Sequence, residues 1–209
     1  DYSEYPQLLV RSFLAAEDKT FFSHGGIDYP GIASAIITNL SSSGRPVGAS
    51  TITQQVAKNL LLTNELSYRR KVREAILAMR IEDALTKEQI LELYLNEIPL
   101  GRRAFGVQAA ARAYFDKDVD ELDLHEMAFL AILPKAPERY GRKGQEQAAL
   151  ERRNFVLQQM EANGFITGSE RSAAAALPLG LVTQRRERSV DAGYFLEEVR
   201  RELIDRFGE

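Results

Sequence analysis

Cysteine and tryptophan are absent from this chain of 209 residues, and histidine occurs only twice, as His24 and His125. Without cysteine the chain can form neither a disulfide nor a thiolate metal site. Two scattered histidines are too few for a histidine-based metal centre. No apolar run approaches the ~18 residues that a membrane-spanning helix needs. These absences exclude a disulfide scaffold, a cysteine or histidine metal centre and a transmembrane segment within the sequence.

A surplus of positive charge is missing as well, because the formal net charge is −3. Nucleic-acid binders usually carry a basic surplus, so we expect no nucleic-acid partner. The apolar and charged fractions, 44% and 27%, are ordinary for a globular protein of one or two domains. The opening residues DYSEYPQ lack an initiator methionine and resemble the start of an excised domain.

Helical patterns recur along the chain, whereas strand patterns are weak. They predict helices at about residues 6–18, 29–41, 50–62, 67–85, 87–96, 104–114, 123–133, 146–163 and 190–207. Thr86 and Asp123 each begin a capping-box pattern, and Ser50 stands where a cap would serve the third helix. Polar loops are expected at 41–48, 99–101 and 134–144. The sequence therefore predicts a mostly α fold with short connections.

An acidic pair interrupts the apolar face of the first predicted helix. In LLVRSFLAAEDKTFFSHGG, residues 8–26, Val10, Phe13 and Phe21 have the spacing of a buried face, and Glu17 lies among them, followed by Asp18. A carboxylate left unpaired there would be costly or would take up a proton. A salt bridge or a helix end would be the structural explanation; a catalytic acid or base is the functional one.

His24 and the two glycines after it predict a sharp turn that holds the imidazole near this acidic pair. We interpret His24 as an organiser of the site. In STITQQVAKN, Thr51, Gln55 and Lys58 have helical spacing that places them on one face. That face could simply be solvated, but glutamine amides also suit sugar hydroxyls.

A basic cluster is the third polar feature. Arg69, Arg70, Lys71 and Arg73 crowd one helical turn around Glu74. An exposed pair such as Arg70 and Glu74 contributes only tenths of a kcal/mol, roughly. The cluster fits either a solvated charged face or a site for two adjacent phosphates.

The three features together suit one type of reaction. A base removes the proton of a sugar hydroxyl, which attacks an anomeric carbon bearing a phosphate leaving group. A raised pKa would help a carboxylate to act near neutral pH. The basic cluster would stabilise the charge that develops on the departing phosphate.

Four ordered motifs resemble those of the peptidoglycan glycosyltransferases: EDKTFFSHGG, GASTITQQVAKN, RRKVRE and KEQILELYLNEIPLG, within residues 17–101. Residues 110–137 resemble the next segment of that family. These enzymes are the lipid II polymerising domains of bifunctional class A penicillin-binding proteins and their monofunctional relatives. The resemblance implies a lysozyme-like helical fold, with a larger head lobe and a small membrane-facing jaw lobe at about residues 27–62.

Residue roles follow from this resemblance by matched position. Glu17 would be the base that deprotonates the 4-hydroxyl of the acceptor GlcNAc, and attack on the donor MurNAc carbon would invert it. Arg70 and Lys71 would hold the donor pyrophosphate, while Glu74, the second predicted catalytic residue, would orient them or a bound ion. The other predicted substrate-binding residues shape the acidic turn or line the cleft: Asp18, Phe21, His24, Ser50, Thr51, Gln55, Lys58 and Asn59.

The resemblance further implies a divalent cation, Mg²⁺ or Mn²⁺, with Glu74 and the pyrophosphate as candidate ligands, and no organic cofactor. Expected partners are lipid II, the growing glycan strand and the membrane surface. Residues 1–184 would form the glycosyltransferase domain, and 185–209 a linker towards a transpeptidase domain outside this chain. We expect the protein on the outer, periplasmic face of the bacterial cytoplasmic membrane, anchored by an N-terminal helix that precedes this sequence.

Three alternatives stay open at this level. The apolar segments of residues 27–62 could be ordinary core instead of a membrane-docking surface. The enzyme could be a muramidase, since lysozyme-like folds with two carboxylates also cleave glycans, although a hydrolase has little need of the basic cluster. An inert cell-wall-binding module would be expected to have exposed aromatic platforms, but the chain has no tryptophan, and such a module would not need an acid on a buried face.

Overall fold

The computed structural model describes residues 1–41, 48–61, 68–142 and 144–182. Within these ranges the regular structure is helical, apart from one isolated antiparallel bridge between Pro99 and Phe105. The α-helices are α1 Gln7–Glu17, α2 Tyr29–Ser41, α3 Ile52–Leu61, α4 Tyr68–Ala84, α5 Lys87–Glu97, α6 Val107–Phe115, α7 Leu124–Leu130, α8 Pro137–Tyr140, α9 Glu146–Ala162 and α10 Gly168–Ala176. The predicted mostly α class is confirmed, whereas the lysozyme-like lobes stay a prediction.

Most predicted helices form within a few residues of the expected bounds, but one ends early and two further helices were not predicted. Helix α7 ends at Leu130, before a 3-10 turn at Leu133–Lys135 that contains a proline, which cannot continue the ladder of helical hydrogen bonds. Helix α8 lies inside a segment predicted as loop, and α10 was not predicted. The helix predicted at 190–207 and the whole of the predicted linker, 185–209, lie outside the described residues.

Helix starts follow the predicted chemistry with one correction. The capping boxes at Thr86 and Asp123 are both present. At α3 the predicted cap, Ser50, is wrong, because Thr51 Oγ1 accepts from the backbone N–H of Gln54 at 3.1 Å. The side chain of Gln54 in turn accepts from the N–H of Thr51 at 3.0 Å. Thr51 and Gln54 have the three-residue spacing that a capping box requires, and so Thr51 is the cap.

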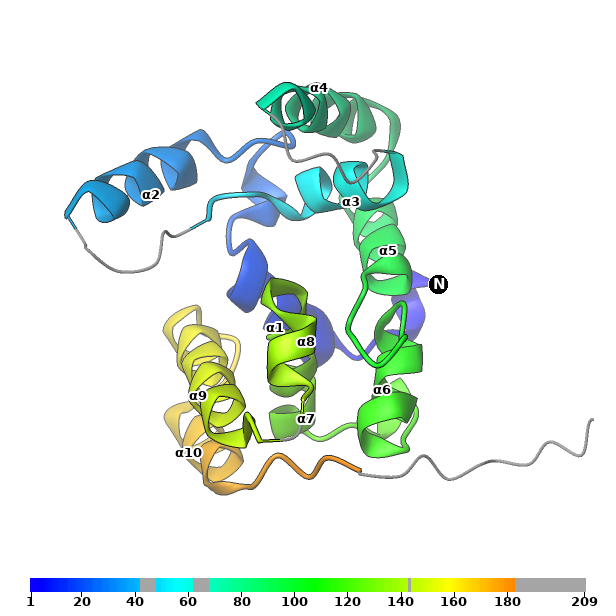
Figure 1. Ribbon diagram of the computed structural model, residues 1–209, viewed down its shortest axis with the longest axis vertical. Coiled ribbons are helices and arrows are strands. Elements are labelled where there is room, and N and C mark those ends of the chain that lie inside the picture. Colours follow the sequence, from blue (N-terminus) through cyan, green and yellow to red (C-terminus); the bar gives the residue numbers. More distant parts are fainter. Residues whose placement is uncertain (42–47, 62–67, 143, 183–209) are drawn as a thin grey trace, which may run out of the picture.

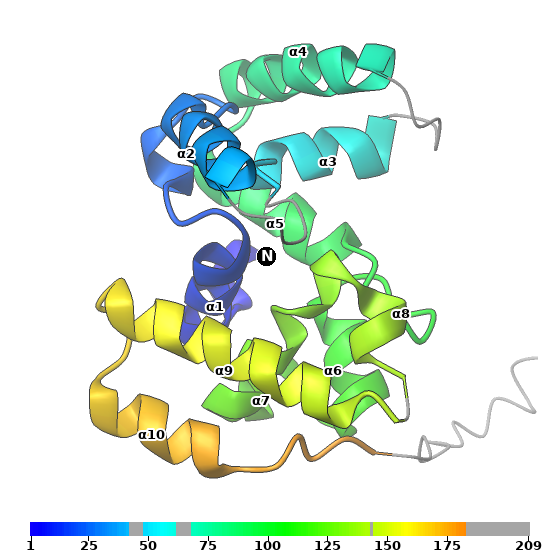
Figure 2. The same ribbon diagram turned by 60° about the vertical axis from the view of Figure 1, so that its left-hand side comes forward.

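The helices divide between two ends of the molecule, as Figures 1 and 2 both show. Helices α2, α3 and α4 lie at one end, and α7, α9 and α10 lie at the other. Helix α3 packs against α4 and α5, while α1 packs against α7 and α9. Helix α5, which also packs against α4 and α6, therefore connects the two ends, and the C-terminus of α1 points towards the α2–α4 end.

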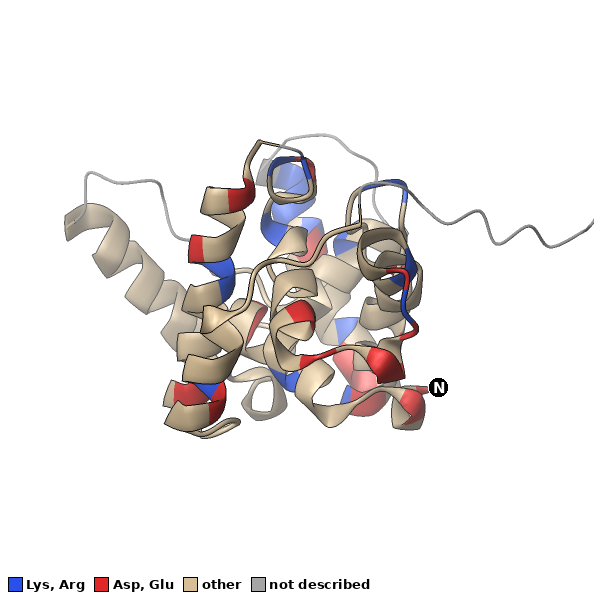
Figure 3. Ribbon diagram, turned by 90° about the horizontal axis from the view of Figure 1, so that it is seen from below, with Lys and Arg blue, Asp and Glu red and all other residues tan. Residues whose placement is uncertain are grey.

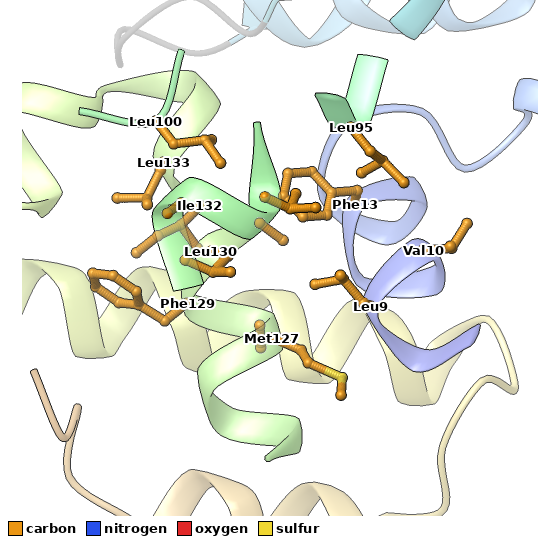
Figure 4. Close-up of a cluster of buried hydrophobic side chains, with 14 of the residues drawn as sticks. Leu9, Val10, Phe13, Leu95, Leu100, Met127, Phe129, Leu130, Ile132 and Leu133 are labelled. Carbon is orange, nitrogen blue, oxygen red and sulfur yellow. The ribbon is translucent and has the colours of Figure 1, made fainter. Parts of the chain in front are cut away.

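The main core surrounds α1 and α7 (Figure 4). Leu9 and Phe13 of α1 are fully buried, as are Phe129 and Leu130 of α7. Phe13 meets the ring of Tyr94 from α5 edge-on, with centroids 6.0 Å apart. The apolar face predicted for the first helix is thus confirmed, and it fixes the position at which α1 ends.

Helix α2 contributes little to this core. The side chain of Ala35 in α2 is buried, but those of Ile36, Ile37 and Leu40 are 54%, 67% and 85% exposed. The interpretation of α2 as ordinary core is therefore wrong. Figure 3 shows α2 free of charged residues, in agreement with its sequence. Among the described residues, no helix combines the length and the apolar character needed to cross a membrane.

Two arginines fix the last described segment, which follows α10. The fully buried side chain of Arg153 donates to the carbonyl oxygens of Leu177 and Pro178 at 2.8 and 3.1 Å. Arg102 Nη1 donates to the carbonyl of Val182 at 3.0 Å, and its guanidinium lies 4.3 Å from the ring centroid of Tyr114. Arg102 has a φ of 48°, which is rare outside glycine.

Candidate active site

Glu17 is the last residue of α1. It is half-buried, because the helix ends there as it leaves the core. Nε2 of Gln55, on α3, donates a hydrogen bond to its Oε2 at 2.8 Å. Burial raises the pKa of the Glu17 carboxyl, while this bond and the charges of Arg152 and Lys135 act to lower it and Asp18 acts to raise it. The net upward shift suits a group that must accept a proton near neutral pH.

Asp18 lies on the turn after α1, where it is tied from two sides. Its carboxylate is 3.0 and 3.1 Å from Nε2 of His24, and its Oδ2 accepts from the backbone N–H of Ile52 at 3.0 Å. Burial raises the pKa of the Asp18 carboxyl, although these two partners act to lower it. The predicted proximity of His24 to the acidic pair is confirmed.

The other ring nitrogen of His24 faces the backbone of its own turn. Nδ1 lies 3.1 Å from the N–H of Gly26, which donates to it. This contact favours the tautomer with its proton on Nε2, from where it is donated to Asp18. Phe21 is fully buried with its ring edge-on to the imidazole, and so it supports His24 from within the protein.

The N-terminus of α3 joins the acidic turn to the basic helix. Thr51 Oγ1 donates to the carbonyl of Gly26 at 2.7 Å, and the next residue, Ile52, donates to Asp18. Ser50 Oγ accepts from Nζ of Lys71 on α4 at 2.8 Å. Residues 50–52 therefore contact both the acidic turn and the basic cluster on α4, which are far apart in the sequence.

Glu74 is 2% exposed and is held between two cations of its own helix. Its Oε1 is 3.0 Å from Nε of Arg70, and its Oε2 is 2.7 Å from Nζ of Lys71. The Lys71 side chain remains half-exposed, whereas that of Arg70 is mostly covered. The interpretation of the basic cluster as a purely solvated face is therefore wrong for its centre, because a buried carboxylate fixes the two basic groups.

The remaining predicted residues differ in their positions relative to the acidic turn. Lys58 and Asn59 are exposed on the later part of α3, and Asn59 borders a small pocket that Tyr94 and Glu97 of α5 also line. Thr51 and Phe21 are buried by their roles in the cap and the turn, which does not fit direct contact with substrate. Both have supporting positions instead.

Sequence reasoning missed three residues near Glu17. Arg152 of α9 and Lys135 of a 3-10 turn place positive charge near its carboxylate. Nε of Arg152 is buried without a hydrogen-bond partner among the described residues, and its guanidinium lies 4.7 Å from the ring centroid of Phe155. Tyr94 of α5 is fully buried, and its pKa is raised by burial and by the two acids. No local pattern in the sequence indicates that these distant segments meet.

A protein-built metal site is not supported at Glu74. Both of its oxygens face cations, and the described residues contain no group of three or more His, Cys, Asp or Glu side chains suited to a metal ion. The expected divalent cation stays a prediction.

The family model for transglycosylases matches residues 1–161. The chain belongs to the transglycosylase family. It is 46% identical over 202 residues to penicillin-binding protein 1A of Rickettsia prowazekii, covering 95% of this chain and 26% of the relative. The corresponding protein of Pseudomonas aeruginosa is 42% identical over 207 residues, covering 99% and 25%. The motif-based identification as a peptidoglycan glycosyltransferase domain is thereby confirmed.

A solved structure gives the same result. The crystal structure of penicillin-binding protein 1A from Haemophilus influenzae matches with a TM-score of 0.50 and 30% identity, over 99% of this chain and 21% of that one. The chain spans about a quarter of the length of the curated relatives it matches.

Proposed function

We propose that this domain polymerises a polyprenyl-pyrophosphate-linked disaccharide-peptide, lipid II, by inverting glycosyl transfer. The acceptor 4-hydroxyl oxygen forms a bond to the donor anomeric carbon, whose bond to the pyrophosphate oxygen breaks. The hydroxyl proton passes to Glu17, and the polyprenyl pyrophosphate leaves. The observation that carries this proposal is the placement of Glu17. Its half-buried carboxylate is fixed by Gln55 of α3, and Ser50, just before α3, contacts Lys71 of the basic helix.

Glu17 acts as the general base in this proposal. Its raised pKa makes the carboxylate a better proton acceptor than an ordinary glutamate, and Gln55 fixes one of its oxygens. Asp18 is buried against His24 and the N-terminus of α3, and so it positions the turn and does not react.

Arg70 and Lys71 bind the donor pyrophosphate and stabilise the charge that develops as it leaves. Glu74 holds both cations in place before the substrate arrives, which reduces the reorganisation needed during the reaction. Ser50 contacts Lys71, and the exposed Lys58 and Asn59 extend the binding surface along α3.

The substrate's polyprenyl tail stays in the bilayer, and so the site must open at the membrane surface. Helix α2 offers the exposed, uncharged side chains of Ile36, Ile37 and Leu40 for docking there. Burial of apolar area contributes about 25 cal/mol per Å². Because only a few side chains would be buried, the attachment to the membrane would be reversible. A following transpeptidase domain, an N-terminal anchor and a location outside the cytoplasmic membrane complete the proposal, in agreement with the greater length of the relatives.

Hydrolysis of glycans fits this arrangement less well. A glycosidase needs two carboxyl groups that flank the scissile bond. Asp18 is committed to His24 and Ile52, and Glu74 to Arg70 and Lys71. Neither acid is positioned as the second partner of Glu17.

Incubation of the chain with purified lipid II, followed by gel electrophoresis of the products, tests the proposal. Long glycan strands are the expected result. Shortening of preformed strands would identify a muramidase instead, and unchanged substrate and strands would identify a binding module.

A further inference from the structure

Lys87, the first residue of α5, reaches away from its own helix towards the acidic turn. Its Nζ donates to the backbone carbonyl of His24 at 2.7 Å and to Oε1 of Glu82 at 2.8 Å. The ammonium group lies 4.3 Å from the ring centroid of Phe21. Its side chain is only 19% exposed, so these contacts are largely shielded from water.

The position of Lys87 is not explained by α5 itself. The N-terminus of a helix carries a partial positive charge, which disfavours a cation in the first turn by roughly 0.3–1 kcal/mol. The Thr86 capping box already satisfies the start of this helix. The contacts of Lys87 are instead with other parts of the chain, all of them near the candidate active site.

Glu82 extends the same network to a third helix. Its Oε1 also accepts from Oγ1 of Thr53 on α3 at 2.6 Å, so that one carboxylate oxygen joins α3, α4 and Lys87. The side chain of Glu82 is 10% exposed, and Thr53 is fully buried. Lys87 is thus the point at which this buried network meets the acidic turn.

The turn itself has little freedom to shift independently. Gly26 has a φ of 89° and packs so closely on Ala78 of α4 that an added Cβ would lie 2.9 Å from that residue's backbone. His24, whose carbonyl Lys87 binds, uses its ring to hold Asp18, which in turn holds Ile52. A displacement of the His24 backbone would therefore pass to the first turns of α3.

We propose that Lys87 is a positioning residue for glycosyl transfer, acting through His24. By fixing the His24 carbonyl it holds the imidazole against Asp18, and hence the start of α3 from which Gln55 reaches Glu17. This inference rests on the proposed role of Glu17 as the base. It predicts that loss of Lys87 disorders the geometry of the reacting groups more than it lowers overall stability.

Lys87→Met tests this, with Lys117→Met as the matched control. Lys117, which follows α6, forms an ion pair of the same length, 2.8 Å, with Glu126 of α7. We expect Lys87→Met to lower kcat by about 10- to 100-fold with KM changed less than twofold, because small displacements of reacting groups have effects of that size. The control should keep its kcat, and both variants should show similar losses in thermal midpoint.

Nitrogen NMR of the imidazoles supplies a readout that needs no substrate. The chain has only two histidines, and the signals of His24 can be assigned by their loss in His24→Asn. In the wild type they should show a single tautomer with the proton on Nε2. In Lys87→Met they should shift towards the tautomer average, while Lys87→Arg, which keeps a donor and a charge, should restore the wild-type pattern and part of kcat.

The outcomes separate this inference from the proposed function. An inactive wild type with the expected change in His24 signals would contradict the proposed function and leave the link between Lys87 and His24 supported. Unchanged His24 signals in Lys87→Met would overturn the positioning role, whatever happens to activity. Equal losses of kcat in the lysine variants, matched to equal losses of stability, would show that Lys87 only supports the fold.

Discussion

Nε2 of Gln55 and Oε2 of Glu17 form a 2.8 Å hydrogen bond that joins the first turn of α3 to the last residue of α1. The bond spans the two packing groups, because α1 rests on α7 and α9, whereas α3 rests on α4 and α5. The position of the proposed base therefore depends on how the two ends of the molecule are held together.

Glu17→Gln should abolish polymerisation while leaving the fold and donor binding intact. Removal of a general base lowers the rate by at least about 100-fold, and glutamine can still accept the Gln55 bond. Turnover of lipid II by the variant checks this, with circular dichroism as the control for folding. More than about a tenth of wild-type turnover would contradict the role of Glu17.

The same variant should also reveal a stability cost at the site. The folded-state pKa of Glu17 is raised, so the folded protein holds this proton more tightly than the unfolded chain. Stability linked to Glu17 is present below the unfolded pKa and falls as pH rises through the folded pKa. Glu17→Gln should thus have a higher thermal midpoint than the wild type at pH 7, and this advantage should shrink at pH 4. A midpoint difference that does not change with pH would contradict the raised pKa.

Arg152→Gln should shift the acid limb of the pH–rate profile to higher pH. Arg152 favours the charged form of Glu17, and its removal should raise the pKa of that carboxyl further. Arg139→Gln serves as the control, because Arg139 lies over Tyr140 on α8 and is not among the charged groups that shift the pKa of Glu17. Identical acid limbs in both variants would show that Arg152 does not act on the base.

Arg70→Ala and Lys71→Ala should each impair turnover and donor affinity, because each removes charge that meets the leaving pyrophosphate. Lys71→Arg should restore only part of the activity, since a planar fork replaces a compact ammonium group. Arg80→Ala, an exposed change on the same helix, is the control. If the two alanine variants match this control, the cluster has no part in donor binding.

The sequence motifs predicted several residues that lie together around the acidic turn, among them Asp18, His24 and Gln55, but not how they would be oriented. Spacing placed Thr51 on the face of Gln55 and Lys58, whereas capping of α3 turns Thr51 inward. Apolar periodicity located α1 correctly, because a buried face leaves a regular signal. Arg152 and Lys135 leave no such signal, since their proximity to Glu17 depends on how α1 packs against distant parts of the chain.

Helix α2 should attach the domain to membranes. Replacing Ile36 and Ile37 with Asp should abolish flotation with liposomes, because charged side chains cannot be buried among acyl chains at low cost. Leu177→Asp, at an exposed site after α10, should float like the wild type. Circular dichroism must show that all variants fold. If the wild type does not float, or the double variant floats equally well, docking through α2 is wrong.

The contacts of Arg102 with Val182 and Tyr114 have a mechanical consequence. Tension applied to the chain beyond residue 182 would first meet the Val182 backbone, which is bonded to the carbonyl of Tyr114 at 2.8 Å and to Arg102 at 3.0 Å. Tyr114 is fully buried against Phe129, so the force would enter the centre of the core. Helix α10 would therefore be shielded from a force applied beyond residue 182, because the load would reach the core first.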